Sequence, residues 1–186
     1  MAPTGARIET ARLILRPPED ADADTIEGFV SDAEVALQTA AIPHPYPKGG
    51  VRDWIRSLGG ALTLVIARRD NAAVIGGISL AEPQQAVSEL GYWIARNHWG
   101  RGYATEAARG ALEIARALGH GRVLSGHFVD NPASGRVLRK LGFRETGEVR
   151  PTECRARGGE MVLTRRYALD LAEAELAAQG DRMRVA

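Results

Sequence analysis

The residues best suited to chemistry lie in the segment ELGYWIARNHWGRGYATEA, which spans residues 89–107. Its alternating apolar start predicts a strand, and a glycine-containing turn then leads into alanines typical of a helix. The first amides of a helix have no acceptor within the helix, so they can bind an anion. Gly100 and Gly102 keep bulky side chains away from those amides. The segment therefore predicts a site for a pyrophosphate group.

Two familiar phosphate-binding motifs do not fit this turn. A P-loop requires Lys followed by Ser or Thr after the last glycine, whereas Tyr103 and Ala104 follow Gly102 here. The dinucleotide-binding fingerprint requires a third glycine where Thr105 stands. A strand-to-helix turn in which the glycines serve only to tighten the bend is the structural alternative.

The same turn resembles the coenzyme A signature of the GNAT superfamily, which is Gln or Arg, two residues, Gly, one residue, then Gly or Ala. The corresponding stretch runs from Trp99 to Ala104, and Trp99 departs from the first position. WGRGYATEA is similar to the RimJ/RimL branch of ribosomal-protein N-terminal acetyltransferases, which tolerates Trp there. A second block, DNPASGRVLRKLGF at 130–143, resembles the family's segment after the fifth strand. The likeness covers about residues 8–169.

This resemblance implies a fold and an activity. The GNAT fold is of the α/β (α+β) class, with a mixed, mostly antiparallel sheet of about seven strands, about four flanking helices, and a parallel strand-helix-strand unit at the coenzyme site. The implied activity is transfer of an acetyl group from acetyl-CoA to a primary amine, either a protein N-terminal α-amine or a small-molecule amine. An acyl-CoA-binding regulatory protein without turnover is the alternative.

The resemblance also implies which residues contact the coenzyme. The backbone of Ile94, Ala95 and Arg96 faces the pantetheine arm. The pyrophosphate cradle follows Trp99 and Gly100 and consists of Arg101, Gly102, Tyr103, Ala104, Thr105 and Glu106. The side-chain amide of Asn131 is a further candidate contact, although helix capping alone would explain that residue.

Acetyl transfer needs a neutral amine, so a general base is useful. Glu89, at the start of the strand, is the candidate base, and an exposed glutamate without a catalytic part is the alternative. Many superfamily members place a Tyr donor where this chain has Leu138. Ser134 is the substitute that the RimJ/RimL resemblance suggests for stabilising the leaving thiolate; its hydroxyl could instead bond the first turn of its own helix.

The acceptor is expected on the other side, near the early helices. Seven acidic residues and no basic one lie between positions 17 and 34, which we interpret as an attraction for a cationic amine, with solvated surface as the alternative. Tyr46 and Trp54 are candidate walls of the acceptor site.

Periodicity predicts the elements that carry these residues. We expect a meander of strands, then the parallel unit, then a final pair of strands, at 12–16, 62–67, 73–80, 88–95, 123–129, 144–152 and 160–167. Helices are expected near 19–30, 51–58, 100–118 and 132–141, with a short helix capped by Ser31 and Glu34, and a loop at 42–50. We expect one domain over residues 1–170 and a helical or disordered tail at 171–186.

Composition narrows the remaining possibilities. The net charge of +1, from 24 basic and 23 acidic residues, does not favour nucleic-acid or membrane partners. One cysteine, Cys154, excludes an internal disulfide, and the histidines show no metal-ligand spacing, so no metal is expected. The first residues do not resemble a secretory signal, which favours a cytoplasmic location. The acceptor's identity and a homodimer are left open.

Overall fold

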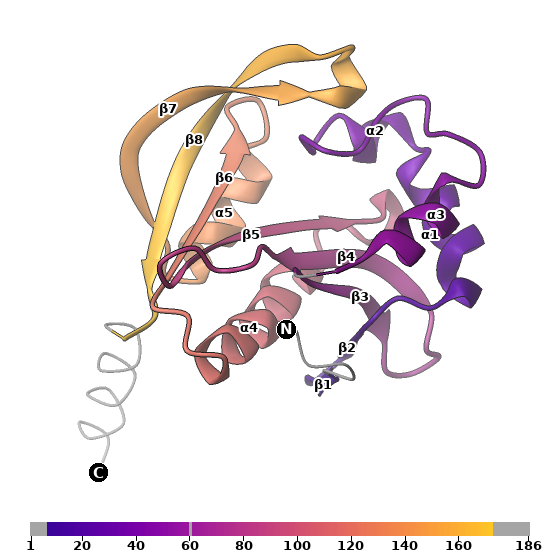
Figure 1. Ribbon diagram of the computed structural model, residues 1–186, viewed down its shortest axis with the longest axis horizontal. Helices are drawn as coiled ribbons and strands as arrows, with labels where there is room; N and C mark the ends of the chain where they lie inside the picture. The colour runs from indigo at the N-terminus through magenta and orange to yellow at the C-terminus, as the bar shows by residue number, and fades with distance from the viewer. Residues whose placement is uncertain (1–6, 60, 173–186) are drawn as a thin grey trace.

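A mixed eight-stranded sheet forms the centre of the molecule, as the computed structural model shows for residues 7–59 and 61–172 (Figure 1). The strands lie in the order β1-β2-β3-β4-β5-β6-β8-β7. They are β1 (Ile8–Glu9), β2 (Leu13–Arg16), β3 (Leu62–Arg68), β4 (Val74–Leu80), β5 (Val87–Ile94), β6 (Arg122–Phe128), β7 (Arg144–Cys154) and β8 (Glu160–Asp170). The predicted fold class is confirmed, and β1 is the strand that periodicity missed.

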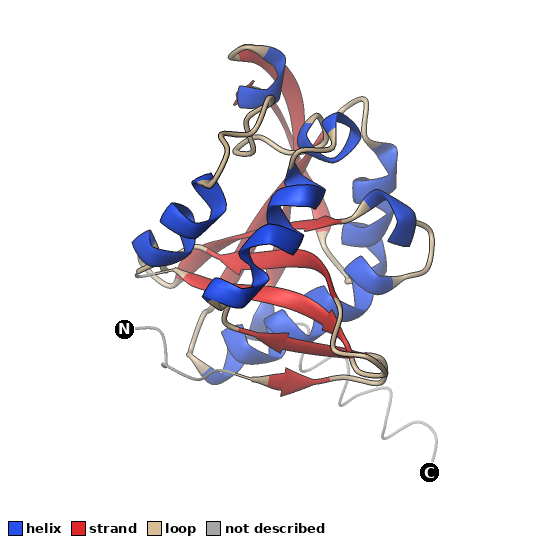
Figure 2. Cartoon of the chain, turned by 90° about the vertical axis from the view of Figure 1, so that its right-hand side faces the viewer, coloured by secondary structure: helices blue, strands red, loops and turns tan. Residues whose placement is uncertain are grey.

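Helices cover both faces of this sheet (Figure 2). The α-helices are α1 (Ala23–Val30), α2 (Ala33–Ala36), α3 (Gly50–Ser57), α4 (Tyr103–Ala117) and α5 (Pro132–Lys140). Single 3₁₀ turns are η1 (Asp20–Asp22), η2 (Arg96–His98) and η3 (Arg155–Arg157). The described residues thus form five α-helices, which correspond to the four predicted helices and the predicted short helix. In the described parts of the chain, no helix combines the length and apolar character needed to cross a membrane.

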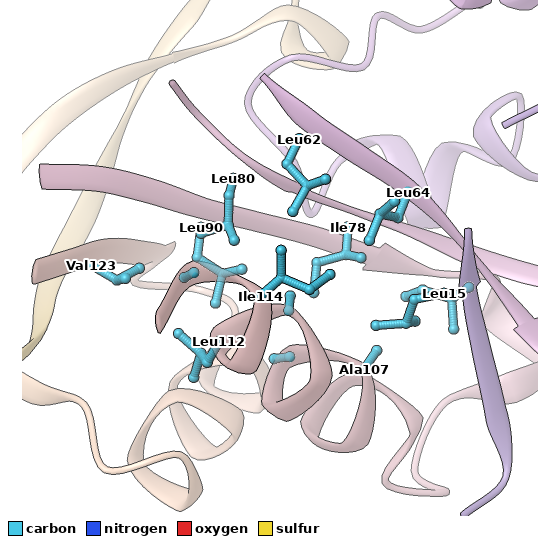
Figure 3. Packing of buried hydrophobic residues seen from close by; sticks show 14 of the residues in the cluster. Leu15, Leu62, Leu64, Ile78, Leu80, Leu90, Ala107, Leu112, Ile114 and Val123 are labelled. Carbon is cyan, nitrogen blue, oxygen red and sulfur yellow. The ribbon is translucent and has the colours of Figure 1, made fainter. Parts of the chain in front are cut away.

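Helix α4 packs on the sheet through its alanine-rich face. Ala107, Ala108 and Ala111 are at most 1% exposed, and they pack with the strand residues Leu64, Ile78 and Leu90 (Figure 3). Side chains alternate across a strand, so β3 also supplies Val65 and Ala67 to a second cluster on the opposite face. That second cluster buries Ile26 of α1 and Val51 of α3. The sheet therefore separates two cores.

The short helix α2 begins differently from the predicted capping box. Asp32 is its N-cap, and its side chain accepts a hydrogen bond from the Glu34 amide at 2.9 Å. Ser31 instead ends α1, and its amide donates to the Glu27 carbonyl at 3.0 Å. The prediction was wrong by one residue because Asp and Ser are both good caps and the sequence offers them side by side.

Strands β5 and β6 separate soon after they pair. Their parallel register covers only Val87–Glu89 against Arg122–Leu124, and the two strands then diverge (Figure 1). Where they part, the Ser125 hydroxyl donates to the Leu90 carbonyl at 2.9 Å, so a side chain replaces a ladder hydrogen bond. The later part of β5 thus has one side of its backbone available.

The hairpin of β7 and β8 reaches back to α2 (Figure 1). At its tip, the Arg155 amide donates to the Ala40 carbonyl at 3.1 Å, and Arg157 Nη2 donates to the Leu37 carbonyl at 3.2 Å. The same Nη2 pairs with Asp130 Oδ2 at 2.8 Å, before α5. Three segments far apart in the sequence are therefore joined at this tip.

The chain after β8 was predicted to be a tail. Leu171, the first residue of that segment, is 2% exposed, and its amide donates to the Gly121 carbonyl at 3.0 Å. This residue therefore packs with the sheet core. Residues 173–186 of the predicted tail lie outside the described residues.

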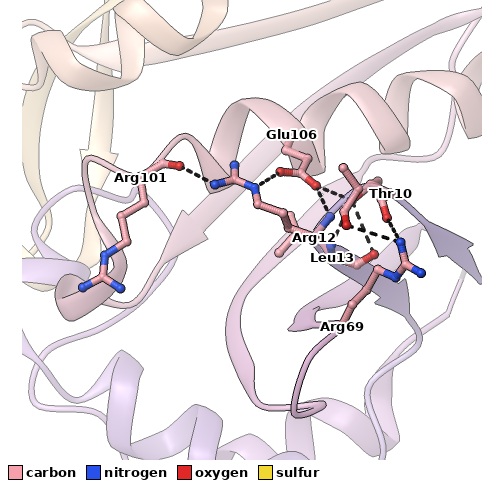
Figure 4. A network of polar contacts seen from close by, with 7 residues as sticks. Thr10, Arg12, Leu13, Arg69, Arg101 and Glu106 are labelled. Carbon is pink, nitrogen blue, oxygen red and sulfur yellow. Dashed lines mark hydrogen bonds and ion pairs between the residues drawn. The ribbon is translucent and has the colours of Figure 1, made fainter.

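A polar network fastens the start of α4 to the β1–β2 turn (Figure 4). The carboxylate of Glu106 accepts hydrogen bonds from Thr10 Oγ1 at 2.6 Å and from both N and Nε of Arg12 at 2.7 Å. Arg12 also donates to the Arg101 carbonyl at 3.0 Å. Burial raises the pKa of Glu106, but these hydrogen bonds and the Arg12 charge outweigh it, so the pKa lies below its ordinary value.

We predict that Glu106→Gln lowers the free energy of unfolding by ~1–3 kcal/mol at neutral pH, since it removes charge-assisted hydrogen bonds. The pKa is lowered in the folded state, so the contribution is present above the unfolded value of 4.5 and is lost as pH falls through the folded value. Urea unfolding at several pH values measures it. The control Glu113→Gln, whose pair with Arg116 is exposed, should change stability by under ~0.5 kcal/mol. Equal effects at pH 7 would contradict this assignment.

Candidate coenzyme and acyl-transfer site

A pocket of about 530 Å³ lies between the end of β5, the N-termini of α4 and α5, and α2. We refer to it as the α4–α5 pocket. Both helices direct their positive ends towards it, so it suits an anionic ligand. The site residues predicted from the sequence that line it are Ile94, Trp99, Gly100, Gly102, Tyr103, Ala104, Thr105, Asn131 and Ser134.

The turn before α4 has the backbone geometry that an anion cradle requires. Gly100 and Gly102 have φ of 74° and 78°, in the left-handed region that favours glycine. The Glu106 amide already donates to the Gly102 carbonyl at 3.1 Å. The amides before it have no acceptor within the helix, so Tyr103, Ala104 and Thr105 offer theirs to a ligand. Glu106 offers neither amide nor carboxylate, because both are engaged.

Trp99 replaces the Gln or Arg of the coenzyme A signature and has a defined contact. Its Nε1 donates to the Ile94 carbonyl at 2.6 Å, while the residue remains 42% exposed and lines the α4–α5 pocket. The indole therefore ties the turn to the end of β5. Arg96 and Arg101 are exposed and, like the buried Ala95, lie outside the pocket lining.

The end of β5 presents an unpaired backbone amide to this pocket. Ala95 donates its amide to the Ile75 carbonyl at 2.8 Å, next to the Gly76–Ile94 pair of β4 and β5. Backbone groups of successive strand residues point to opposite sides, so the Ile94 amide points away from β4 into the gap before β6. It is suitably placed to bind a carbonyl oxygen.

Ser134 lies in the first turn of α5 and faces the α4–α5 pocket. Asn131 caps the helix, with its Oδ1 accepting from the Ser134 amide at 3.2 Å. The Ser134 hydroxyl does not bond its own turn; it lies 2.8 Å from the Tyr92 hydroxyl. Leu138, one turn further, is fully buried in the core. Tyr92 is a site residue that sequence reasoning missed, although it lies inside the conspicuous GYWI strand.

Glu89 lies on the opposite face of β5 from Tyr92 and is not among the residues that line the α4–α5 pocket. Its Oε1 accepts from Arg166 Nη1 at 2.7 Å, and the two side chains are 49% and 7% exposed, respectively. Arg166 reaches Glu89 across β6, beside Gly126, where a Cβ atom would lie 3.0 Å from its Nη1. An alanine at that position would crowd the arginine.

Basic side chains of α5 and η2 complete the lining. Arg136 and Lys140 line the α4–α5 pocket, as does His98. Burial, followed by the charges of Arg101 and Arg68, lowers the pKa of His98. Its Nδ1 is buried without a hydrogen-bond partner in the described part of the chain. Cations and free amides at one wall fit a ligand with several phosphate groups, such as a coenzyme A thioester.

The acidic segment has more partners than the sequence suggested. Asp20, Asp22 and Asp24 pair with Arg56, Arg16 and Arg52, at 3.4, 2.7 and 2.9 Å. Burial raises the pKa of Asp22, but the Arg16 hydrogen bond and charge and the Glu19 amide outweigh it and leave the pKa below its ordinary value. Arginines of β2 and α3 thus pair with three aspartates of the acidic segment.

The two candidate acceptor walls belong to the second core. Tyr46 and Trp54 pack against the cluster of α1, α3 and β3, and neither lines the α4–α5 pocket. Burial, and then the charge of Glu27, raises the pKa of Tyr46. On this side, the α4–α5 pocket is instead lined by Trp93 and by Val35, Gln38 and Thr39 near α2.

Comparison with known proteins assigns the family. Residues 12–144 match the acetyltransferase (GNAT) domain family. The uncharacterised N-acetyltransferase YoaA of Bacillus subtilis is 34% identical over 164 residues, covering 77% of this chain and 85% of YoaA. The chain therefore belongs to the GNAT family, as its resemblance predicted, and is an acetyl-CoA-dependent acetyltransferase.

Solved structures share the fold at lower identity. RimL, the ribosomal L7/L12 alpha-N-protein acetyltransferase in complex with coenzyme A, gives a TM-score of 0.77 at 18% identity, covering 89% of this chain and 98% of RimL. Spermidine N-acetyltransferase from Vibrio cholerae, in complex with CoA and spermine, gives 0.73 at 19% identity, with 88% and 98% covered.

We predict that Gly100→Ala weakens coenzyme A binding by about tenfold or more, because alanine disfavours the left-handed backbone that opens the cradle. Gly119→Ala is a matched control: Gly119 has φ of 77° and equally open surroundings, but it follows the other end of α4. Both variants should lose similar stability, and only Gly100→Ala should lose affinity in calorimetry. Unchanged affinity in Gly100→Ala would refute the cradle.

Proposed function

We propose that this enzyme transfers the acetyl group of acetyl-CoA directly to a primary amine, with Glu89 as general base and Ser134 as the group that stabilises the thiolate. The observation that carries this proposal is that the Ser134 hydroxyl and the free amides of α4 line one pocket. A coenzyme held by those amides along the end of β5 has its sulfur within the reach of α5. Nothing in this arrangement favours a binding protein without turnover.

Each residue then has a chemical task. Tyr103, Ala104 and Thr105 hold the pyrophosphate through their amides, and Asn131 adds a side-chain contact. The Ile94 amide donates a hydrogen bond to the oxyanion that develops as the amine attacks the thioester carbon. The C–S bond breaks, its electron pair goes to sulfur, and a hydrogen bond from the Ser134 hydroxyl stabilises that charge.

Glu89 is suited to act on the proton of the amine from the other face of β5. Its carboxylate is half exposed, so a water molecule can link it to the reacting nitrogen. Arg166 holds the carboxylate in place through a hydrogen bond of 2.7 Å. The base and the thiolate-stabilising group therefore approach the thioester from opposite sides.

For the acceptor, we infer an amine with a single positive charge. Among the residues lining the α4–α5 pocket, Asp130 is the acidic one, and it is paired with Arg157. Three aspartates of the early helices are likewise paired with arginines. A polyamine needs several free carboxylates, whereas a peptide α-amine, of the kind that RimL's name specifies, or a small monoamine needs none.

We predict that Glu89→Gln lowers kcat/KM by about 100-fold, because the amide cannot take up the proton of the amine. Ser134→Ala should lower kcat by a similar factor while leaving the KM for acetyl-CoA nearly unchanged. Thiol release from acetyl-CoA, measured across a panel of amines, reports both effects. Glu82→Gln, on an exposed loop, is the control for loss of a surface carboxylate. Wild-type kcat/KM in either variant would remove that residue from the mechanism.

The same panel tests the inferred acceptor charge. We expect kcat/KM for spermidine to be at least about tenfold lower than for a peptide with a free α-amine, because the pocket lacks unpaired carboxylates to bind the additional ammonium groups. Salt should have little effect on either value, because Asp130, the acidic residue that lines the pocket, is already paired with Arg157. A spermidine preference that declines steeply with salt would contradict the inference.

A further inference from the structure

The Tyr92 hydroxyl lies 2.8 Å from Ser134 Oγ and 3.3 Å from the Ser134 carbonyl oxygen. We propose that Tyr92 is a positioning residue that donates its hydrogen to Ser134 Oγ and so directs the Ser134 hydrogen towards the sulfur of the departing thiolate. This inference rests on the proposed function of Ser134, and it assigns a task to a side chain that the mechanism above does not use.

The direction of the hydrogen bond follows from the partners available. A phenol and a hydroxyl each have one hydrogen, and either Tyr92 or Ser134 can donate across the 2.8 Å contact. If Ser134 donates, the Tyr92 hydrogen bonds the Ser134 carbonyl and the serine has nothing left for a ligand. A thiolate in the α4–α5 pocket attracts the Ser134 hydrogen, and Tyr92 then donates to Oγ. Charge on the ligand therefore selects the productive arrangement.

Tyr92 keeps its proton throughout this change. Burial raises the pKa of its phenol to about 12, although the Ser134 hydrogen bond opposes the shift. Thiols are stronger acids than a phenol with this raised pKa, and a cysteine thiol, for example, has an ordinary pKa of about 8.5, so proton transfer from this phenol to a thiolate is unfavourable. The contact therefore orients and polarises the serine, and both hydroxyls retain their hydrogens while sulfur leaves with the electron pair.

The location of Tyr92 couples it to the rest of the site. It lies on β5 two residues before Ile94, whose amide faces the gap, and its ring packs against the α4 core. One strand thus supplies the oxyanion amide directly and the thiolate hydrogen bond through Ser134. A shift of β5 would affect both groups together.

The bound coenzyme A thiol gives a readout independent of turnover. Thiolate ultraviolet absorbance, followed against pH in the saturated complex, reports the pKa of that thiol. We expect the wild-type protein to lower this pKa by about one unit relative to free coenzyme A, because a hydrogen bond stabilises the charged form. Ser134→Ala should abolish the shift, and Tyr92→Phe should remove a large part of it.

Kinetics of the same variants supply the second measurement. Tyr92→Phe should lower kcat by about tenfold with the KM for acetyl-CoA within about twofold, and the double variant should be no slower than Ser134→Ala. Tyr167→Phe is the control: its buried phenol donates to Glu145 at 2.8 Å, so its loss should reduce stability and leave the bound thiol pKa unchanged.

Three negative results of these measurements would lead to different conclusions. If Tyr92→Phe retains the wild-type thiol pKa and kcat, or if its effect adds fully to that of Ser134→Ala, the positioning role is overturned while the proposed function stands. If the wild-type protein does not lower the thiol pKa, the roles of Ser134 and Tyr92 both fail. If coenzyme A does not bind or no amine is acetylated, the proposed function fails as well.

Discussion

The divergence of β5 from β6 after Glu89 is the constraint on which the site depends. A buried backbone group without a partner costs ~1–3 kcal/mol, so a sheet can open only where other groups replace the ladder. Ser125 does this at Leu90, and the Trp99 indole does it for the Ile94 carbonyl. The Ile94 amide is left for a ligand. The gap is therefore held open by side chains and exposes a donor at its widest part, next to the N-termini of α4 and α5.

Strand alternation then distributes the chemistry over two faces. Glu89 and Trp93 share one face of β5, and Leu90 and Tyr92 share the other. The candidate base consequently lies towards the early helices, while the phenol meets Ser134 on α5. A one-residue shift of β5 would exchange these side chains between the two faces, and both arrangements would be lost. In the proposed mechanism, the meander register from β2 to β5 therefore determines from which side of the thioester each group approaches.

Local chemistry explains which parts of the site the sequence could predict. The glycine turn, the alanine face of α4 and the Asn131 cap each arise within a few neighbouring residues, and the structure has each of them. Contacts between distant segments escaped prediction. Tyr92 meets Ser134 over 42 positions, and Arg166 meets Glu89 over 77. The acidic run suggested a strong field because its arginine partners come from β2 and α3, which only the fold brings alongside.

The two ends of the α4–α5 pocket differ in the same way. The end that faces the amides of α4 is formed by local sequence and is called the donor end, because it suits the acetyl donor, whereas the opposite end is formed by distant segments. The donor end is made by one continuous stretch of backbone, which the contacts of Arg12 and Trp99 hold in place. The opposite end, called the acceptor end because we propose that the acceptor enters there, is lined by Val35, Gln38 and Thr39, and Arg157 of η3, at the β7–β8 tip, supports it by bonding both the Leu37 carbonyl and Asp130. Burial of Cys154 beneath the same tip, with its Sγ donating to the Thr39 carbonyl at 3.4 Å, adds a second attachment. Substitutions in these segments can reshape the acceptor end without disturbing the amides of α4, so acceptor choice can vary while the coenzyme site is retained.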